Sequence, residues 1–227
     1  MAMIHLQVVG TNQTVIVGNT HLYWNPARAD IKTVQTMAVL QALKKFDHDI
    51  CAKLSDTTTT VANKDLHYGK RIHTPLILCG DFNTMPDMGY NDATNSFLQT
   101  APFEILSNGC LTVDHPQHPD KWFITLGRDT ASPRLGHLET ANRLLNSYYL
   151  PEFVEQKPMF TTKTDDFQGW IDHIWTSDDV RVNMVFSPPI RSSDLDANKK
   201  AREFSPIPNK HFHSDHSPLG IIASLDV

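Results

Sequence analysis

The segment PLILCGDFN at residues 75–83 is the most informative part of the sequence for the fold. Its first half, Pro75–Cys79, is a short apolar run between a proline and a glycine, which is typical of a buried strand. Gly80 then lets the backbone approach a neighbour closely. Asp81 and Asn83 stand two positions apart and point to the same side of an extended segment. The stretch predicts a buried strand that presents two polar side chains at its end.

The segments on either side of this strand alternate in type. Residues 14–22 form a β-branched run that predicts a second buried strand. Residues 30–54 place apolar side chains at three- and four-residue steps, which indicates a helix lying on a sheet. We also expect adjacent strands at 170–175 and 182–186, a last strand at 219–225, a helix at 138–149 and a surface loop at 187–213. The alternation predicts an α/β or layered α+β fold, and without a repeat or linker residues 1–227 form one expected domain.

The composition excludes several classes of protein. The 227 residues are 40% hydrophobic, and 20 Lys and Arg against 25 Asp and Glu leave a net charge of −5. This charge argues against a generally basic nucleic-acid coat protein. Three cysteines without a C-x-x-C spacing argue against a disulfide framework or a structural zinc site. Since no signal peptide and no apolar run of roughly 18 residues is present, we expect a cytoplasmic protein, with the nucleus as a second location.

Four segments share one pattern, an apolar strand followed by polar side chains that can bind a metal. They are Asn19-Thr20-His21, Asp81-Phe82-Asn83, Ile171-Asp172-His173 and Ser214-Asp215-His216. Side chains on strand ends are held rigidly and can converge on one cleft. Each segment alone is also explained by a capped turn or a packing histidine. The combination favours a functional site.

The chemistry of these side chains suits phosphodiester hydrolysis. Asp81 and Asn83 offer oxygens to one hard cation, and Mg²⁺ prefers a few such ligands while it keeps several waters. A histidine oriented by a carboxylate, as His216 is beside Asp215 or Asp172, suits phosphate contact or acid–base work near neutral pH. A phosphodiesterase needs a metal, a group that activates water and donors for the phosphate oxygens.

Longer strings around these segments resemble the endonuclease/exonuclease/phosphatase superfamily. They are NTHLYWNP (19–26), CGDFNTMPD (79–87), FQGWIDHIW (167–175) and HSDHSPLG (213–220), and they occur in the family's order. NTHLYWNP followed by a long helix is most similar to the carbon-catabolite-repressor type deadenylases, which remove mRNA poly(A) tails from the 3′ end. Residues 103–116 and 158–162 also resemble that subgroup, so the resemblance covers nearly the whole chain.

The resemblance implies a catalytic set, namely His21, Asp81, Asn83, Asp172 and His216. His21 is expected to contact the scissile phosphate and stabilise its developing charge. Asp172 is expected to orient His216, and His216 to contact the phosphate or the metal.

The resemblance also implies a set of metal ligands, namely Asp81, Asn83, Asp215 and His216. Asp81 and Asn83 would bind Mg²⁺ or position the attacking water and the phosphate. Asp215 would support the metal-bound water. Mg²⁺ is the expected cofactor, with Mn²⁺ as an alternative.

Two further residues, Pro26 and Phe167, match positions that pack against the terminal adenine in the deadenylases. An aromatic face stacks on a base at about 1–3 kcal/mol. The alternative for Phe167 is a core aromatic, but its polar neighbours Asp165, Asp166 and Gln168 favour an exposed loop. The implied partner is the poly(A) 3′ end of an RNA, together with a deadenylase complex reached through regions outside this sequence.

The sequence departs from the family pattern in two peripheral places and in one serious one. His213 stands where the subgroup commonly has proline, and Asn25 where it has aspartate. Family members also begin with a strand bearing an asparagine and a Leu-Gln-Glu motif whose glutamate binds Mg²⁺. Here Leu6-Gln7 is followed by Val8, and the first glutamate is Glu104.

The sequence therefore resembles the C-terminal half of the family's catalytic domain. The expected fold is a DNase I-like two-layer β-sandwich flanked by helices, with its N-terminal portion missing. We expect weak Mg²⁺ binding, low or absent activity, and an apolar sheet face left exposed unless a partner covers it.

The leading hypothesis is an Mg²⁺-dependent 3′–5′ exoribonuclease that trims poly(A) to 5′-AMP. One alternative is another superfamily enzyme, such as a nocturnin-like dinucleotide phosphatase, an angel-like cyclic-phosphate hydrolase or a 2′-phosphodiesterase. A second alternative is a non-catalytic binding scaffold, which the missing glutamate supports and the intact polar set opposes. Lys199, Lys200, Arg202 and Lys210 either assist RNA binding or form a solvated loop.

Overall fold

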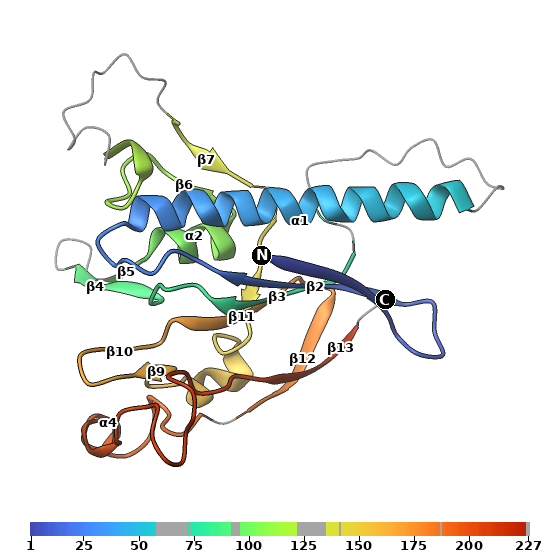
Figure 1. The fold of residues 1–227 in the computed structure, drawn as a ribbon. Helices are drawn as coiled ribbons and strands as arrows, with labels where there is room; N and C mark the ends of the chain where they lie inside the picture. The colour runs from blue at the N-terminus through green and yellow to red at the C-terminus, as the bar shows by residue number, and fades with distance from the viewer. Residues whose placement is uncertain are drawn as a thin grey trace.

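A five-stranded sheet in the order β1-β2-β3-β11-β8 lies at the centre of the fold (Figure 1). The computed structural model describes residues 1–57, 72, 74–91, 96–121, 135–140, 142–186 and 188–225. The strands of the central sheet are β1 (Ala2–Gln7), β2 (Thr14–His21), β3 (Leu76–Asp81), β11 (Asp172–Thr176) and β8 (Leu145–Asn146). β2 and β3 are parallel, and the other neighbours are antiparallel.

A long helix, α1 (Ala29–Thr57), connects β2 to β3 and covers one face of the sheet. A parallel pair needs such a crossover because the chain must return to the same end of the sheet. Leu43 of α1 joins Ile16 and Leu78 of the strands in one core cluster, each 0% exposed. The helix lies close to β2 because Gly18 has no side chain, and a Cβ there would be 3.2 Å from Leu43 and from Leu78.

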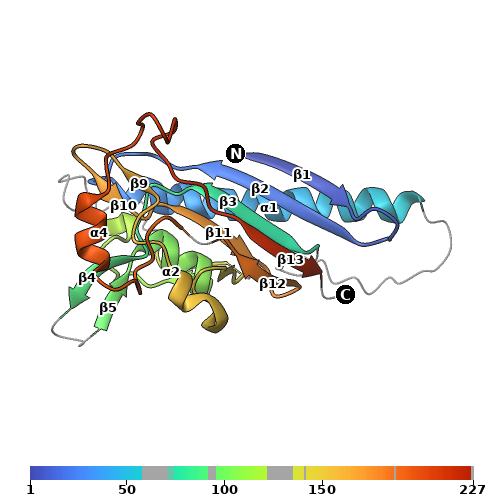
Figure 2. The same cartoon turned by 90° about the horizontal axis from the view of Figure 1, so that it is seen from below.

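A second, smaller layer lies on the side of the sheet opposite α1. It contains β12 (Val180–Val185) paired with β13 (Ile221–Leu225), and β9 (Thr162–Lys163) paired with β10 (Gln168–Gly169). Tyr148, Trp170 and Val185 form a separate core cluster there. Figure 2 shows β1, β2, β3 and β11 side by side with α1 behind them. The mixed α/β fold, with helices outside the strands, agrees with the expected class.

The remaining elements are short. They are β4 (Asp87–Asn91) with β5 (Ser96–Gln99), β6 (Cys110–Leu111) with β7 (Leu138–Glu139), α2 (Ala101–Asn108), the 3-10 helix η1 (Pro151–Gln156) and α4 (Ala197–Glu203). α2 packs Phe103 and Ile105 into the core beneath α1. In the part of the chain that the structure describes, no helix is long and apolar enough to cross a membrane.

The strand registers sort the side chains of the sheet onto two faces. Successive residues of a strand point to opposite faces, and directly paired residues share a face. Leu78 and Trp175 pair on the face that α1 covers, and both are 0% exposed. Val17 pairs with Ile4 and with Ile77 on the other face, which we call the open face. Ile4 is 52% exposed there, so the expected exposure of apolar side chains on one sheet face is present near β1.

The structure confirms the expected main helix and buried strands, and it corrects three other expectations. Residues 138–149 are not a helix but contain β7, β8 and turns. The Asn146 side-chain oxygen accepts the Tyr148 N–H, and Asn142 accepts the N–H of Ile72; such bonds compete with a helical ladder. The expected loop at 187–213 contains α4, and β12 pairs with β13 rather than with β11. β1 was not expected.

Candidate active site

Strand register brings three of the expected site residues into one row on the open face. His21 ends β2 and pairs with Asp81 at the end of β3. Asp81 pairs in turn with Asp172 at the start of β11. His216 arrives from the loop before β13, and its backbone forms a bridge with Thr162 of β9. Side chains that lie far apart in sequence therefore converge because the sheet aligns their backbones.

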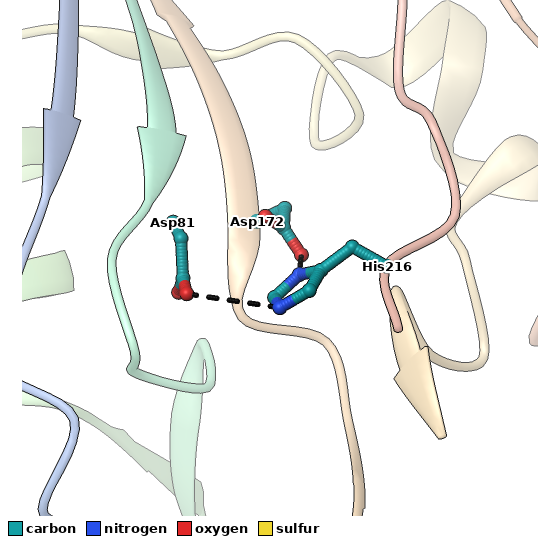
Figure 3. A group of neighbouring side chains, drawn as sticks. All are labelled: Asp81, Asp172 and His216. Atoms are coloured by element: carbon teal, nitrogen blue, oxygen red, sulfur yellow. Dashed lines mark hydrogen bonds and ion pairs between the residues drawn. The ribbon is translucent and has the colours of Figure 1, made fainter. Parts of the chain in front are cut away.

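Asp81, Asp172 and His216 form a compact cluster (Figure 3). His216 Nδ1 donates to Asp172 Oδ2 at 2.7 Å, and Nε2 lies 3.9 Å from Asp81 Oδ2. This contact is the one expected to orient His216. His21 stands at the rim, with its side chain 72% exposed and Nε2 3.4 Å from Asp81 Oδ2.

The turn after β3 fixes Asp81 and Asn83 relative to each other. The Asn83 N–H donates to Asp81 Oδ1 at 2.7 Å, and its Nδ2 donates to the Leu22 carbonyl at 2.9 Å. Gly80 has a φ of +142°, and a Cβ there would lie 1.9 Å from the carbonyl oxygen of Thr20. Only glycine fits that position, because any side chain would clash with the neighbouring strand. The alternative explanation of this segment, a turn whose side chains satisfy backbone donors, is therefore correct for Asp81, which accepts the Asn83 N–H.

Burial and charge shift the pKa values of two groups in the cluster. Burial raises the pKa of Asp81, and the charge of Asp172 adds to this, against the Asn83 N–H and the nearby His216 and His21. Burial would lower the pKa of His216, but the hydrogen bond and charge of Asp172, helped by Asp81 and Asp215, raise it above its usual value. His216 is thus held as a charged or readily charged donor at the site.

The cluster opens into a cavity of about 590 Å³ that also contains the expected base-binding residues. Its lining includes Pro26, Phe167 and Asp215. Phe167 is 44% exposed, and its backbone bonds Thr164 in the tight turn between β9 and β10. The expected exposed loop at Phe167 is confirmed. Trp24, which is 66% exposed, adds a second aromatic side chain to the lining.

The donor set fits a divalent cation. One ligand atom each from Asp81, Asp172 and His216 lies within 4.8 Å of the others. Both carboxylates are hard oxygen donors, as Mg²⁺ and Mn²⁺ prefer. The structure places Asn83 beside Asp81 and Asp215 on the wall of the same cavity, so it brings together all four expected ligands. Asp172 is an additional candidate ligand. From the sequence it was expected only to orient His216.

Sequence reasoning missed one residue of this site, Lys32 in the first turn of α1. Its side chain is 4% exposed, lines the cavity, and donates from Nζ to the Asn83 carbonyl at 2.6 Å. Burial lowers the pKa of Lys32, and the charge of Asp81 opposes this shift. A lysine near the start of a helix ordinarily faces water, and no sequence pattern distinguishes this one.

Comparison with known proteins finds relatives of similar sequence and solved structures of similar fold. No family model matches the chain. The chain is 28% identical over 214 residues to the CCR4-Not complex 3′-5′-exoribonuclease subunit Ccr4 of Aspergillus niger. The aligned region covers 92% of this chain and 28% of that relative. The chain is 25% identical over 216 residues to the CCR4-NOT transcription complex subunit 6-like of Danio rerio, covering 94% of this chain and 34% of the relative. The chain thus spans about a third of the length of these curated relatives.

Solved structures share the fold. ANGEL2, a 2′,3′-cyclic phosphatase, aligns with a TM-score of 0.56 and 20% identity over 94% of this chain and 57% of that chain. The human Nocturnin catalytic domain aligns with a TM-score of 0.50 and 18% identity over 98% of this chain and 52% of that chain. By sequence the chain is thus similar to the CCR4-Not 3′-5′-exoribonuclease subunits, and it shares its fold with ANGEL2 and the Nocturnin catalytic domain.

Proposed function

We propose that this chain carries the catalytic residues of a divalent-metal-dependent 3′–5′ exoribonuclease acting on adenine-rich RNA ends. One observation carries the proposal: Asp81 and His216 of the cluster with Asp172 line the same cavity as the exposed Phe167. A phosphate bound at the cluster therefore leaves its base within reach of an aromatic surface. The sequence relatives, which are named as 3′-5′ exoribonucleases, support this choice among phosphodiesterases.

In the proposed site, Asp81, Asn83, Asp172 and Asp215 would hold a Mg²⁺ or Mn²⁺ ion, and of the two roles expected for His216 we propose contact with the phosphate. The bound ion would neutralise phosphate charge and make a water more acidic. The chain's own groups supply the rest. Asp172 fixes the imidazole of His216 so that Nε2 faces the phosphate, and a charged His216 donates to a phosphate oxygen where negative charge develops. His21 at the rim donates to the same phosphate from the other side.

We place the base against two other residues of the cavity lining, Phe167 and Pro26. Phe167 and Pro26 present flat or apolar surfaces to the terminal adenine, and stacking contributes about 1–3 kcal/mol whatever the base. Selection of adenine then depends on polar groups around that surface. The named partner of the relatives, the CCR4-Not complex, is the partner class that we propose for the whole protein.

The test measures trimming of labelled oligo(A), oligo(U) and oligo(C), with MgCl₂ and with EDTA. We expect slow, Mg²⁺-dependent release of AMP and a preference for oligo(A), because the metal ligands seen here are few. A His211→Ala variant, which changes an exposed histidine of the same loop, is the control for His216→Ala. Equal cleavage of all three oligomers contradicts the adenine proposal, and tight oligo(A) binding that never leads to hydrolysis favours the scaffold alternative.

A further inference from the structure

Lys32 is a buried ammonium group on the wall of the candidate site. It belongs to the first turn of α1, yet only 4% of its surface is exposed. Lysine is almost never this buried unless a partner compensates the loss of water. In the described part of the chain, its ammonium donates one hydrogen bond, and the acceptor is a neutral carbonyl, that of Asn83. Compensation of the charge is therefore incomplete in the described part of the chain.

The charge balance of the cavity makes this lysine distinctive. Three carboxylates, those of Asp81, Asp87 and Asp215, line the cavity. Among the described lining residues, Lys32 is the one Lys or Arg, and His216 is the one histidine. A phosphate brought into this cavity meets several negative charges, so any fixed positive charge there has a large effect at low local dielectric.

The geometry also holds the ammonium in place. Nζ donates one N–H to the Asn83 carbonyl at 2.6 Å, which leaves two N–H donors of the ammonium without a hydrogen bond in the described structure. Asn83 has a φ of +48° and is itself tied to Asp81 and Leu22. One hydrogen bond thus anchors Lys32 to the turn that carries Asp81. Because Lys32 lines the cavity, its two other N–H donors are available to a ligand there.

We propose that Lys32 is a phosphate-binding residue of this site. Its two free N–H donors bind a non-bridging oxygen of the ligand's phosphate, while the third keeps the turn of Asp81 and Asn83 in position. The inference rests on the proposed function for the identity of the substrate, but phosphate binding itself can be measured without an RNA.

The test is a titration of the full chain with inorganic phosphate, with MgCl₂ in every sample, followed by NMR of ¹³C-labelled lysine side chains. We expect phosphate to shift the Lys32 Cε signal and to leave that of Lys45 in place. Lys45 lies on the same helix with its side chain 76% exposed. This measurement needs no variant, and an unmoved Lys32 signal at saturating phosphate overturns the proposal.

Three variants then separate charge from position. Lys32→Gln keeps a donor for the Asn83 carbonyl and loses the charge, so we expect phosphate affinity to fall at least about tenfold, as for a lost hydrogen bond to a charged group. Lys32→Arg, which keeps the positive charge, should retain most of the phosphate affinity. Lys45→Gln makes the same charge change outside the cavity and should have less than about twofold effect, because exposed charges are screened.

A purely structural role predicts a different result. If Lys32 only positions the turn, Lys32→Gln leaves phosphate affinity unchanged or weakens adenosine binding as much as phosphate binding, and either outcome overturns the proposal. Failure of the proposed function looks different again: phosphate still shifts Lys32, but oligo(A) is bound and trimmed no better than oligo(U).

Discussion

Two neighbouring residues of β11 show how the two faces of the central sheet differ. His173 points to the covered face, where it is 1% exposed among Phe82, Phe103 and Trp175. Asp172 points to the open face and binds His216. One strand thus holds a neutral histidine inside the core and a carboxylate at the site, one residue apart. The covered face carries the core packing, and the end of the open face carries the candidate site.

The position of a polar group on the pleat of the strand decides its surroundings and therefore its protonation. His173 Nε2 bonds the Thr84 carbonyl at 2.9 Å, and burial lowers its pKa to about 4. His216 has carboxylate neighbours, and its pKa is raised. The two histidines therefore have opposite preferences for the proton. Substitutions on the covered face should therefore reduce the stability of the fold. Substitutions at the end of the open face should instead reduce ligand binding.

The largest effect is expected from His216→Ala on the open face. Trimming of oligo(A) should fall by about 10²–10⁴-fold, as when a positioned proton-transfer or phosphate-contacting group is lost. The free energy of unfolding should change by about 1 kcal/mol or less, because the side chain is half-buried beside the cavity. Single-turnover kinetics and urea denaturation check both. A large loss of stability with unchanged trimming would place His216 in the core instead.

Leu78→Ala and Ile77→Ala compare the two faces on adjacent residues of β3. Leu78 is 0% exposed beneath α1, so its truncation should cost about 2–5 kcal/mol of unfolding free energy. Ile77 lies half-buried on the open face, and its truncation should cost clearly less. Urea denaturation of both variants measures the difference. Equal costs would mean that the open face is as tightly packed as the covered one.

The pH dependence of stability should carry the signature of His173. Its pKa lies near 6.5 in the unfolded chain and at about 4 in the fold. The unfolded state therefore binds the proton first, and about 3 kcal/mol of stability is lost as pH falls from about 6.5 to 4.

Urea denaturation at several pH values measures this loss. The His173→Gln variant should lose much less stability than the wild type over the same pH range. The raised pKa of His216 acts in the opposite sense, because its contribution is present at low pH and disappears as pH rises through its folded value. A His173→Gln curve that parallels the wild-type curve would contradict the assignment.

The smallest effect is expected from Phe167→Ala, which removes the aromatic surface of the cavity. Affinity for oligo(A) should weaken by about 1–3 kcal/mol, with little change in stability, because the side chain is 44% exposed. Phe186→Ala is the control, since Phe186 is 54% exposed at the end of β12 and does not line the cavity. Fluorescence anisotropy with labelled oligo(A) measures both, and equal losses would argue against stacking on Phe167.

The sequence predicted the parts of this molecule that short patterns encode. The apolar runs of β2 and β3 and the stripe of α1 are local signals, and their polar ends follow at once in the chain. The link between Asp172 and His216 came from family resemblance, since these residues lie far apart in sequence. It takes the register of β3 and β11 to place Asp81 opposite Asp172.

Other features had no readable pattern. The region 138–149 has helix-like leucines, but Asn142 and Asn146 commit their side chains to backbone groups instead. β1 has only a weak alternation, and its strand depends on pairing with β2. Lys32 looks like any surface lysine near a helix start, and only the packing of α1 over the turn at Asn83 buries it.

Paramagnetic broadening by Mn²⁺ tests most directly whether the end of the open face is a metal site. Mn²⁺ added to ¹⁵N-labelled protein should broaden first the amide signals around Asp81, Asp172 and His216. Asp81→Asn should weaken this broadening strongly, while Asp49→Asn, an exposed carboxylate of α1, should leave it unchanged. Broadening centred on α1 or spread evenly over the acidic surface, and insensitive to Asp81→Asn, would contradict a metal site at the end of the open face.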